Sequence, residues 1–556
     1  MQGAEVLVRI LEAEGITDAF GIPGSGINPV YKYLKESNQI KHYTMRHEEA
    51  AVHAADAYFR ASGRMAAAIC TSGPGATNFV TGLYTAWIDS IPLVAITGQN
   101  VTSLLGKDAF QCVDIAAIAK PISKATWCVM KAEDLPAVLQ KAFHTAKAGR
   151  PGPVLIDFPL DVQQADISFD LKTYTSLPVE KPAPDPKKIK QAMDLLDSAR
   201  NPIIIMGGGV ILADASKECV EFAEYMQIPV IMTYMAKGGI PARHPLCAGH
   251  AGIQVGMPLG NRYLLESDVV LGIGCRFTDR HTGKIDVYKG NRKFIHIDIE
   301  SSQIGRIFPP ELGIVSDAKL ALQALLEEAK KRGPHRKPSE RVRRLPELRE
   351  QLKRKTDYDQ VPIKPQRVYK EINEFFDDET LFTTGCGLNQ IWSGQLQEIN
   401  KPRHYLPTGG AGTLGFDIPA AIGASLSTGK KRVVAVMGDF GFTFLVEELA
   451  VAAKYRIPIT VLVLNNANLS LIRQNQKYTY GFEYAIEMKE NKEFIDYIKV
   501  SEGFGCKAER VTRPDEIKPA LERASNHPGP SVIEVFVEDC ADCSMGISID
   551  SIKEFV

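Results

Sequence analysis

The strongest constraint on this 556-residue chain is a pattern that occurs three times: a short apolar β-branched run, a glycine-rich turn and then a helical pattern. Clear examples are residues 66–87 (AAAICTSGPGATNFVTGLYTAW), 202–212 (PIIIMGGGVIL) and 432–442 (RVVAVMGDFGF). Strands that alternate with helices in this way form parallel, doubly wound sheets, which bind ligands at the carboxyl ends of their strands. We therefore predict an α/β protein made of doubly wound parallel-sheet domains.

Two polar segments divide the three occurrences. Residues 177–188 (LPVEKPAPDPKK) are proline-rich and charged, which is typical of a semi-rigid linker. Residues 330–366 are rich in Lys and Arg, and such a run is more often a solvated helix between domains than a polyanion site. We expect α/β domains at 1–176, 189–330 and 365–556, with a linker at 331–364, sizes that are ordinary for domains.

Composition argues against several function classes. The net charge of −1 gives no reason to expect nucleic acid or an anionic membrane as a partner. No apolar run reaches the ~18–20 residues that span a bilayer, and the first residues lack the sections of a signal peptide. Of ten scattered cysteines, only Cys540 and Cys543 form a CxxC pair, without a second pair to complete a metal site. Scattered thiols predict a cytoplasmic protein.

The last domain carries the most specific pattern, at residues 433–474. Asp439 follows one predicted strand and Asn466 ends the next, so a βαβ unit should bring both side chains to one edge of the sheet. A carboxylate, an amide oxygen and a nearby backbone carbonyl suit Mg²⁺ that also binds water and a phosphate. The helix that starts after GDFG would offer its free N–H groups to that phosphate. Alone, GD is commonly a turn and NN a loop; their pairing is more specific.

A second notable segment is 46–63 (RHEEAAVHAADAYFRASG), which predicts a helix that ends at Gly63. One face is polar and comprises Glu49, His53, Asp56 and Arg60; the face that should be buried comprises Ala51, Val52, Ala55 and Phe59. Glu48 belongs to the second face. This segment alone allows either an acid favoured by the helix dipole or a desolvated acid that moves a proton.

The GDFG and NN pair, with the upstream segment LPTGGAGTLGFDIPAAIGAS (406–425), resembles the signature of thiamine-diphosphate (ThDP) enzymes. The resemblance implies that Asp439, Asn466 and the carbonyl of Asn468 hold Mg²⁺ on the diphosphate, and that Leu414 lies under the bent cofactor. The other implied cofactor-binding residues are Gly412, Gly438, Phe440, Gly441 and Leu469. Glu48 would be a buried acid of raised pKa that bonds N1′ of the aminopyrimidine and promotes loss of the thiazolium C2 proton. The resemblance thus favours a functional role for Glu48.

Other segments resemble the acetohydroxyacid synthase and glyoxylate carboligase branch of this family: FGIPGSGINPVY (20–31), TSGPGATN (71–78), DAFQCVDIAAIAKPISK (108–124) and GRPGPVLIDFPLDVQ (149–163). By that resemblance, Ser25 and Gly26 face the reacting carbon, and Phe110 and Gln111 reach the site from a neighbouring subunit. The active form would be a homodimer or a homotetramer with sites at the subunit interface.

The middle domain of this branch binds FAD in a structural, non-redox role. Alone, a GGG turn after a strand is a weak dinucleotide signal, and a tight turn explains it as well. Carried over by position, the implied FAD contacts are Gly208, Gly209, Arg276, Asp298 and Asp317.

Several details are most similar to glyoxylate carboligases, among them RHTG (280–283), NLSLIRQ (468–474) and SMGISIDSIKEF (544–555). Glyoxylate carboligases are unusual in having valine at the relay position, whereas this chain has Glu48. The leading interpretation is decarboxylation of one 2-oxo acid and addition to a second carbonyl, with two glyoxylate molecules giving tartronate semialdehyde and CO₂. The alternative is an acetolactate synthase acting on pyruvate, because one methyl group is worth only ~1–3 kcal/mol of discrimination.

Three residues are candidates for substrate recognition. Arg280 could clamp the acceptor carboxylate, with His281 beside it, although a surface or FAD contact explains Arg280 equally well. Ile472 is expected to line the wall that contacts the donor. Two rival classes remain: a redox flavoenzyme of the pyruvate oxidase type, and a non-catalytic ThDP-fold subunit. The second is disfavoured because Glu48, Asp439 and Asn466 are all present.

Overall fold

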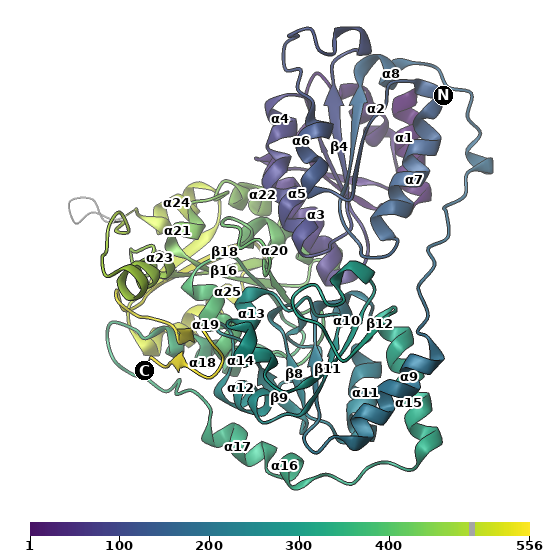
Figure 1. The fold of residues 1–556 in the computed structure, drawn as a ribbon. Helices are drawn as coiled ribbons and strands as arrows, with labels where there is room; N and C mark the ends of the chain where they lie inside the picture. Colours follow the sequence, from purple (N-terminus) through teal and green to yellow (C-terminus); the bar gives the residue numbers. More distant parts are fainter. Residues whose placement is uncertain (489–494, 556) are drawn as a thin grey trace.

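The computed structural model describes residues 1–488 and 495–555 and contains three six-stranded parallel sheets, one in each predicted domain (Figure 1). The strands of the first sheet are β1 (Asp18–Gly21), β2 (Lys41–Thr44), β3 (Ala67–Cys70), β4 (Val94–Gln99), β5 (Ala125–Cys128) and β6 (Val154–Pro159). Those of the second are β7 (Ile203–Met206), β8 (Val230–Met232), β9 (Cys247–His250), β10 (Val269–Ile273), β11 (Lys293–Asp298) and β12 (Leu312–Val315). Those of the third are β13 (Leu381–Thr384), β14 (Tyr405–Pro407), β15 (Val433–Gly438), β16 (Ile459–Asn465), β17 (Lys507–Val511) and β18 (Ser531–Phe536). The predicted fold class is confirmed.

Strand order places the ligand-binding edges. The first sheet has the order β2-β1-β3-β4-β6-β5 and the third has the equivalent order β14-β13-β15-β16-β18-β17. The second, β12-β11-β10-β7-β8-β9, follows the order of dinucleotide-binding folds, with β7 and β10 side by side at its centre. In such sheets the crevice lies where the direction of the strand order reverses. These points are β1/β3, β7/β10 and β13/β15, and the glycine-rich turns follow these strands.

Helices cover both faces of each sheet (Figure 1). The first domain has α1 (Gly3–Ala13), α2 (Asn28–Glu36), α3 (Glu48–Ser62), α4 (Pro74–Thr77), α5 (Phe79–Ile88), α6 (Ile115–Ala119), α7 (Leu135–Lys147) and α8 (Leu160–Gln164). The second has α9 (Pro186–Ser198), α10 (Gly208–Leu212), α11 (Ser216–Met226), α12 (Pro258–Leu265), α13 (Asp279–Thr282), α14 (Ile285–Lys289) and α15 (Ala318–Arg332). The third has α18 (Pro365–Phe375), α19 (Leu388–Leu396), α20 (Asp417–Ser427), α21 (Asp439–Phe442), α22 (Glu448–Lys454), α23 (Ser470–Asn475), α24 (Tyr497–Gly503) and α25 (Ile517–Ser525). A small antiparallel pair, β19 (Met545–Gly546) and β20 (Ile552–Lys553), lies near the C-terminus.

The two connecting segments differ in structure. Residues 174–185 contain no helix or strand, and α9 begins at Pro186, before the predicted domain start at 189. The basic segment does not form one solvated helix. It contains two short helices, α16 (Glu340–Arg343) and α17 (Leu345–Gln351), whose Leu345 and Leu348 are buried against the middle domain. Apolar residues spaced three apart in this segment explain the difference, because they provide a face that packs.

Helix α3 forms as predicted, but its surroundings differ from those expected. The helix packs on α20 of the third domain, and Ala54 O lies only 2.0 Å from where a side-chain carbon on Gly423 would be placed, so the backbones touch. One apolar cluster therefore continues from the first domain into the third. The face predicted to be polar is buried in this contact, since His53, Asp56 and Arg60 are almost completely shielded from solvent. Sequence periodicity cannot show that both faces of a helix are covered.

No helix within residues 1–488 and 495–555 combines the length and the apolar character needed to cross a bilayer.

Candidate active site

The predicted metal ligands come together at the carboxyl ends of β15 and β16. These strands pair in parallel with Gly438 opposite Leu464, so the turns that follow them are neighbours. Asp439 Oδ2 accepts a hydrogen bond of 2.6 Å from the backbone N–H of Ala467, which lies between Asn466 and Asn468. Ser470 joins the group, because its Oγ accepts from Asn466 Nδ2 at 2.6 Å and donates to the carbonyl of Asn468 at 3.1 Å.

The chemistry of this cluster fits Mg²⁺. Burial raises the pKa of Asp439 to about 7, while hydrogen bonds from Phe440 and Ala467 oppose the rise, so a nearby cation would favour the charged form. Among the described residues there is no group of three or more His, Cys, Asp or Glu side chains that could hold a metal. A site with one carboxylate, one amide oxygen and one carbonyl is of a different kind, and hard oxygen ligands of this type suit Mg²⁺.

The predicted diphosphate-binding residues surround the same edge. Phe440 N–H, at the start of α21, donates to Asp439 Oδ1 at 2.9 Å. A side-chain carbon on Gly441 would lie 3.8 Å from Leu414 Cδ2, so Leu414 stands beside this turn. Gly412 has a left-handed φ of +64° in the loop before Leu414. Leu469 is the residue before α23, and its N–H donates to Ile486 O at 2.8 Å.

The turn after β13 lies beside these residues, although it was not among the predicted parts of the site. Asn389, near the start of α19, donates from Nδ2 to Val436 O at 3.2 Å, and its Oδ1 lies 3.4 Å from where a side-chain carbon on Gly438 would be. Cys386 Sγ lies 3.5 Å from where a side-chain carbon on Gly412 would be. The run GCGLNQ (385–390) after the strand LFTT was the available signal, since it repeats the strand-to-glycine-turn pattern.

The predicted residues of the first domain gather around the turn 71–78, which follows β3. Glu48 was predicted to be buried, but it is half-buried because it lies at the first turn of α3, beside the turn 71–78. It accepts a hydrogen bond of 2.9 Å from Asn78 Nδ2, and its Oε1 lies 3.1 Å from where a side chain on Gly75 would begin. Gln111 lies against Gly73, whose φ is +62°. On the other side, Gly26 N–H donates to Thr71 Oγ1 at 3.2 Å. Glu48, Gln111 and Gly26 therefore contact one turn at the β1/β3 crevice.

Two residues beside this cluster are open to solvent. Ser25 is exposed, and the Phe110 side chain is 83% exposed although it is aromatic. Glu48 bonds to Asn78 within the first domain, and Asp439 bonds to Phe440 and Ala467 within the third.

A cavity of about 650 Å³ lies between the three domains. All five residues predicted to contact FAD line it: Gly208, Gly209, Arg276, Asp298 and Asp317. Gly209 N–H donates to Gly274 O at 3.0 Å, and any side chain on Gly209 would clash with the Gly274 backbone. The two turns at the β7/β10 crevice thus touch backbone to backbone, which explains the requirement for glycine. The volume is in the range of cofactor sites.

The charged residues of this cavity have distinct environments. Burial raises the pKa of Asp298 to about 6, while Arg150 and Arg276 oppose the rise. Asp317 caps α15 by accepting from the N–H groups of Lys319 and Leu320, and it pairs with Lys181 Nζ at 3.3 Å. Lys181 belongs to the proline-rich connection, so the linker contributes to the cavity wall. Mixed cations and acids of this kind suit a ligand with both phosphate and hydroxyl groups.

Of the three candidate substrate residues, Arg280 and His281 line the cavity at α13. Arg280 is exposed and opposes the rise that burial causes in the pKa of Cys386, so its charge acts on the turn after β13. His281 is buried, its Nε2 lies 2.7 Å from the hydroxyl of Tyr288, and burial lowers its pKa to about 4. Ile472, in α23, is 50% exposed. Their roles toward substrate stay predictions.

Comparison with known proteins places this geometry in context. Three family profiles match: "Thiamine pyrophosphate enzyme, N-terminal TPP binding domain" at residues 1–118, the "central domain" of the same family at 189–325, and its "C-terminal TPP binding domain" at 385–535. Similar proteins include a glyoxylate carboligase of Escherichia coli O157:H7, 46% identical over 100% of this chain and 96% of that protein.

Acetolactate synthases are similar as well. A probable large subunit from Methanococcus aeolicus is 39% identical over 98% of this chain and 93% of that protein. A large subunit from Corynebacterium glutamicum is 40% identical over 97% of this chain and 87% of that protein. The family matches fall on the three sheets in order, and their two TPP-binding domains contain the Glu48 and Asp439 clusters. The chain is therefore a member of the thiamine pyrophosphate enzyme family.

Proposed function

We propose that this protein is a ThDP- and Mg²⁺-dependent carboligase that converts two glyoxylate molecules into tartronate semialdehyde and CO₂. The observation that carries the proposal is that one chain holds the Glu48 cluster at the turn after β3 and the Asp439 cluster at the turn after β15, which are equivalent strands of two sheets with the same order, as the two halves of a ThDP site would require. The similarity to a glyoxylate carboligase over the whole length supports the choice of substrate.

The chain's residues divide the work. Asp439, Asn466 and the Asn468 carbonyl would hold Mg²⁺ on the diphosphate, and Gly438, Phe440 and Gly441 form the turn that would face the phosphates. When bound, ThDP supplies the electron sink that lets a 2-oxo acid lose CO₂. Leu414, beside Gly441, would contact the bound cofactor and support its bent shape. Glu48, held by Asn78, exchanges a proton with N1′ of the aminopyrimidine.

Substrate recognition falls to residues at the edges of the two clusters. Arg280 is exposed and acts electrostatically on the turn after β13, which suits a guanidinium that pairs with the acceptor carboxylate. Ser25, Gly26, Phe110 and Gln111 come from the first domain, and Ile472 forms the wall toward the donor. His281, the residue after Arg280, is buried and contacts the Tyr288 hydroxyl, which fixes its side chain at this wall of the cavity.

We further propose that the cavity binds FAD in a structural role and that the active form is a homodimer or a homotetramer. The five cavity residues named above would hold FAD. Oligomerisation is supported by the exposed aromatic ring of Phe110, which a second subunit would cover. Ten free thiols favour a cytoplasmic location.

An acetolactate synthase acting on pyruvate is the second candidate, because acetolactate synthases align with nearly the whole chain at 39–40% identity. The deciding experiment supplies glyoxylate and pyruvate separately to the purified protein with ThDP, Mg²⁺ and FAD, and identifies products by mass spectrometry. Tartronate semialdehyde with little acetolactate supports the proposal, whereas dominant acetolactate refutes it. A flavin that becomes reduced by substrate without oxygen would instead indicate a redox flavoenzyme.

A further inference from the structure

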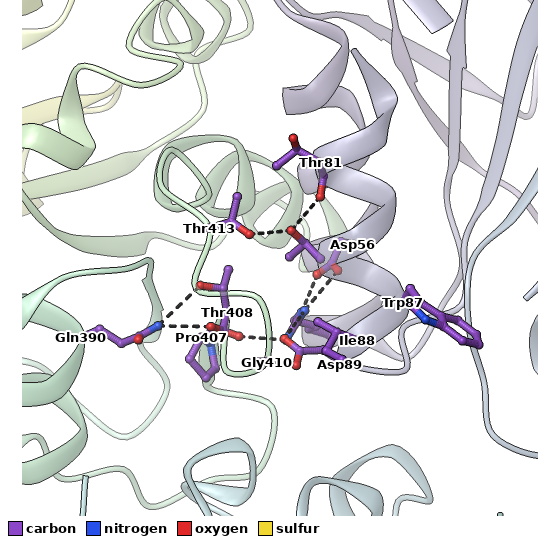
Figure 2. Close-up of polar contacts among 12 residues, drawn as sticks. Asp56, Thr81, Trp87, Ile88, Asp89, Gln390, Pro407, Thr408, Gly410 and Thr413 are labelled. Atoms are coloured by element: carbon purple, nitrogen blue, oxygen red, sulfur yellow. Dashed lines mark hydrogen bonds and ion pairs between the residues drawn. The ribbon is translucent and has the colours of Figure 1, made fainter. Parts of the chain in front are cut away.

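A buried ionic cluster joins the first and third domains (Figure 2). It consists of Asp56 and Arg60 in α3 and Asp89 just after α5, and is called the Asp56–Arg60–Asp89 cluster. Arg60 Nε and Nη2 both donate to the Asp56 carboxylate, and Nη2 also donates to Asp89 Oδ2 at 3.1 Å. The two carboxylate side chains are 0% exposed and the Arg60 side chain is 5% exposed.

The cluster holds the loop that leads to Leu414. Arg60 Nη1 donates to Pro407 O at 2.9 Å, and the N–H of Gly410 donates to Asp89 Oδ1 at 2.9 Å. Close by, the hydroxyls of Thr85 in α5 and Thr413 lie 2.6 Å apart. Figure 2 shows these contacts spread along the loop 407–413. The next residue is Leu414, the proposed cofactor support, so the first domain sets the path of the chain into it.

The same cluster forms part of the cavity wall. Arg60, Asp89, Pro407 and Gly410 all line the cavity. Arg276 of the middle domain brings its Nη2 to 3.9 Å from Asp89 Oδ1. The Asp89 carboxylate is thus approached from all three domains, by Arg60, by Arg276 and by the Gly410 backbone.

The net charge of the Asp56–Arg60–Asp89 cluster connects it to the cavity. Two buried carboxylates share one guanidinium, which leaves a formal negative charge that Arg276 offsets at 3.9 Å, beyond hydrogen-bond distance. Asp89 and Arg60 are shielded from water even without a ligand, so the hydrogen bonds that they make to the loop respond strongly to a change in the charge that faces Asp89. A ligand with phosphates would also fix the guanidinium of Arg276.

We propose that Asp89 is a positioning residue through which a dinucleotide in the cavity orders the loop 407–413 and thereby prepares the ThDP site. The inference rests on the proposed function in two respects, the FAD cavity and the role of Leu414. A flavin that takes no part in redox chemistry would then strengthen the contacts that hold the segment in front of the cofactor.

The test measures hydrogen–deuterium exchange of the peptide that spans 407–414, in full-length protein without ThDP, with and without saturating FAD. It also measures the ThDP dissociation constant under both conditions. In the wild type, FAD should slow exchange of the loop and tighten ThDP binding, each by at least about fivefold, a typical size for coupled sites. In Asp89→Asn, which loses the charge facing Arg60 and Arg276, the flavin fluorescence should still be quenched on binding, but both effects should fall below about twofold.

Asp18→Asn is the matched control. Asp18 also bonds to α3, accepting from the Tyr58 hydroxyl at 2.7 Å, but it does not line the cavity, so this variant should keep the full effect of FAD. Full coupling in Asp89→Asn overturns the proposal. Two results with the wild type alone also overturn the proposal: FAD leaves the exchange of the loop unchanged, or the protein does not bind FAD. None of these readouts needs turnover, so failure of the glyoxylate assignment, seen in the product analysis, is distinguishable.

Discussion

Glu448 offers a sharp test of how the third domain supports Glu48 within one chain. Its Oε1 accepts hydrogen bonds of 2.9 Å from the backbone N–H groups of both Arg46 and His47, the residues directly before Glu48. Glu448 itself is fully buried at the start of α22. Each such bond contributes about 0.5–1.5 kcal/mol, so Glu448→Ala should loosen this segment by roughly 1–3 kcal/mol. Under the proposed proton-relay role of Glu48, kcat depends on how this side chain is held, so we expect kcat to fall by about 5- to 100-fold.

Glu448→Gln is the informative comparison, because the amide keeps an oxygen that can accept from both N–H groups. Its turnover should stay within about threefold of wild type. Hydrogen–deuterium exchange of the peptide 44–50 should be faster in the alanine variant and unchanged in the glutamine variant. Glu447→Ala, at the neighbouring half-buried position, controls for damage to α22. If Glu448→Ala exchanges like wild type, or if the two Glu448 variants behave alike, the positioning argument is wrong.

The same residue predicts a pH dependence of stability. Burial raises the pKa of Glu448 from 4.5 to about 8. As the pH rises through this window the unfolded chain ionises first, so stability that is fully present below about pH 4.5 is lost by about pH 8. The shift corresponds to roughly 5 kcal/mol, as an upper limit. The difference between the melting temperatures at pH 5 and pH 8 should therefore be smaller in Glu448→Gln than in wild type. An equal difference in both proteins would contradict this prediction.

Three further predictions concern the candidate site. Glu48→Gln keeps a hydrogen-bond partner for Asn78 but cannot move a proton, so turnover should fall by about 10²–10⁴-fold while the melting temperature stays unchanged. Turnover within tenfold of wild type would show that Glu48 is not the proton relay. Asp439→Asn removes the one charge of the metal cluster and should weaken Mg²⁺-dependent ThDP binding by at least about tenfold, measured by titration calorimetry; unchanged affinity would mean that the metal lies elsewhere. Arg280→Met should raise KM for the 2-oxo acid by about 10- to 100-fold and change kcat less, in steady-state kinetics; an unchanged KM would assign Arg280 to the cavity ligand alone.

Several features could be predicted because they depend on short-range order. The strand, glycine turn and helix that surround Asp439 are contiguous in the sequence. Parallel strands joined by one helix end at the same edge of a sheet, so the local pattern predicts that Asp439 lies close to the Asn466–Asn468 turn. The five cavity residues share one wall for a related reason, since most follow strands of one sheet. The turn 385–390 was missed although it repeats the same pattern, because a glycine turn without a paired acid is a weak signal.

What the sequence by itself determined was the α/β class, the repeated strand, glycine turn and helix, and the sheet edges at which these turns gather, since these arise from periodicity and turn chemistry along the chain. Only the tertiary structure decided which polar groups are buried and what they touch. Asp56 and Arg60 look like a solvated helix face until α20 and the loop 407–413 cover them. Lys181 looks like a linker residue until it meets Asp317. Such contacts join residues far apart in the chain, so their desolvation and pairing depend on domain packing, which local periodicity does not encode.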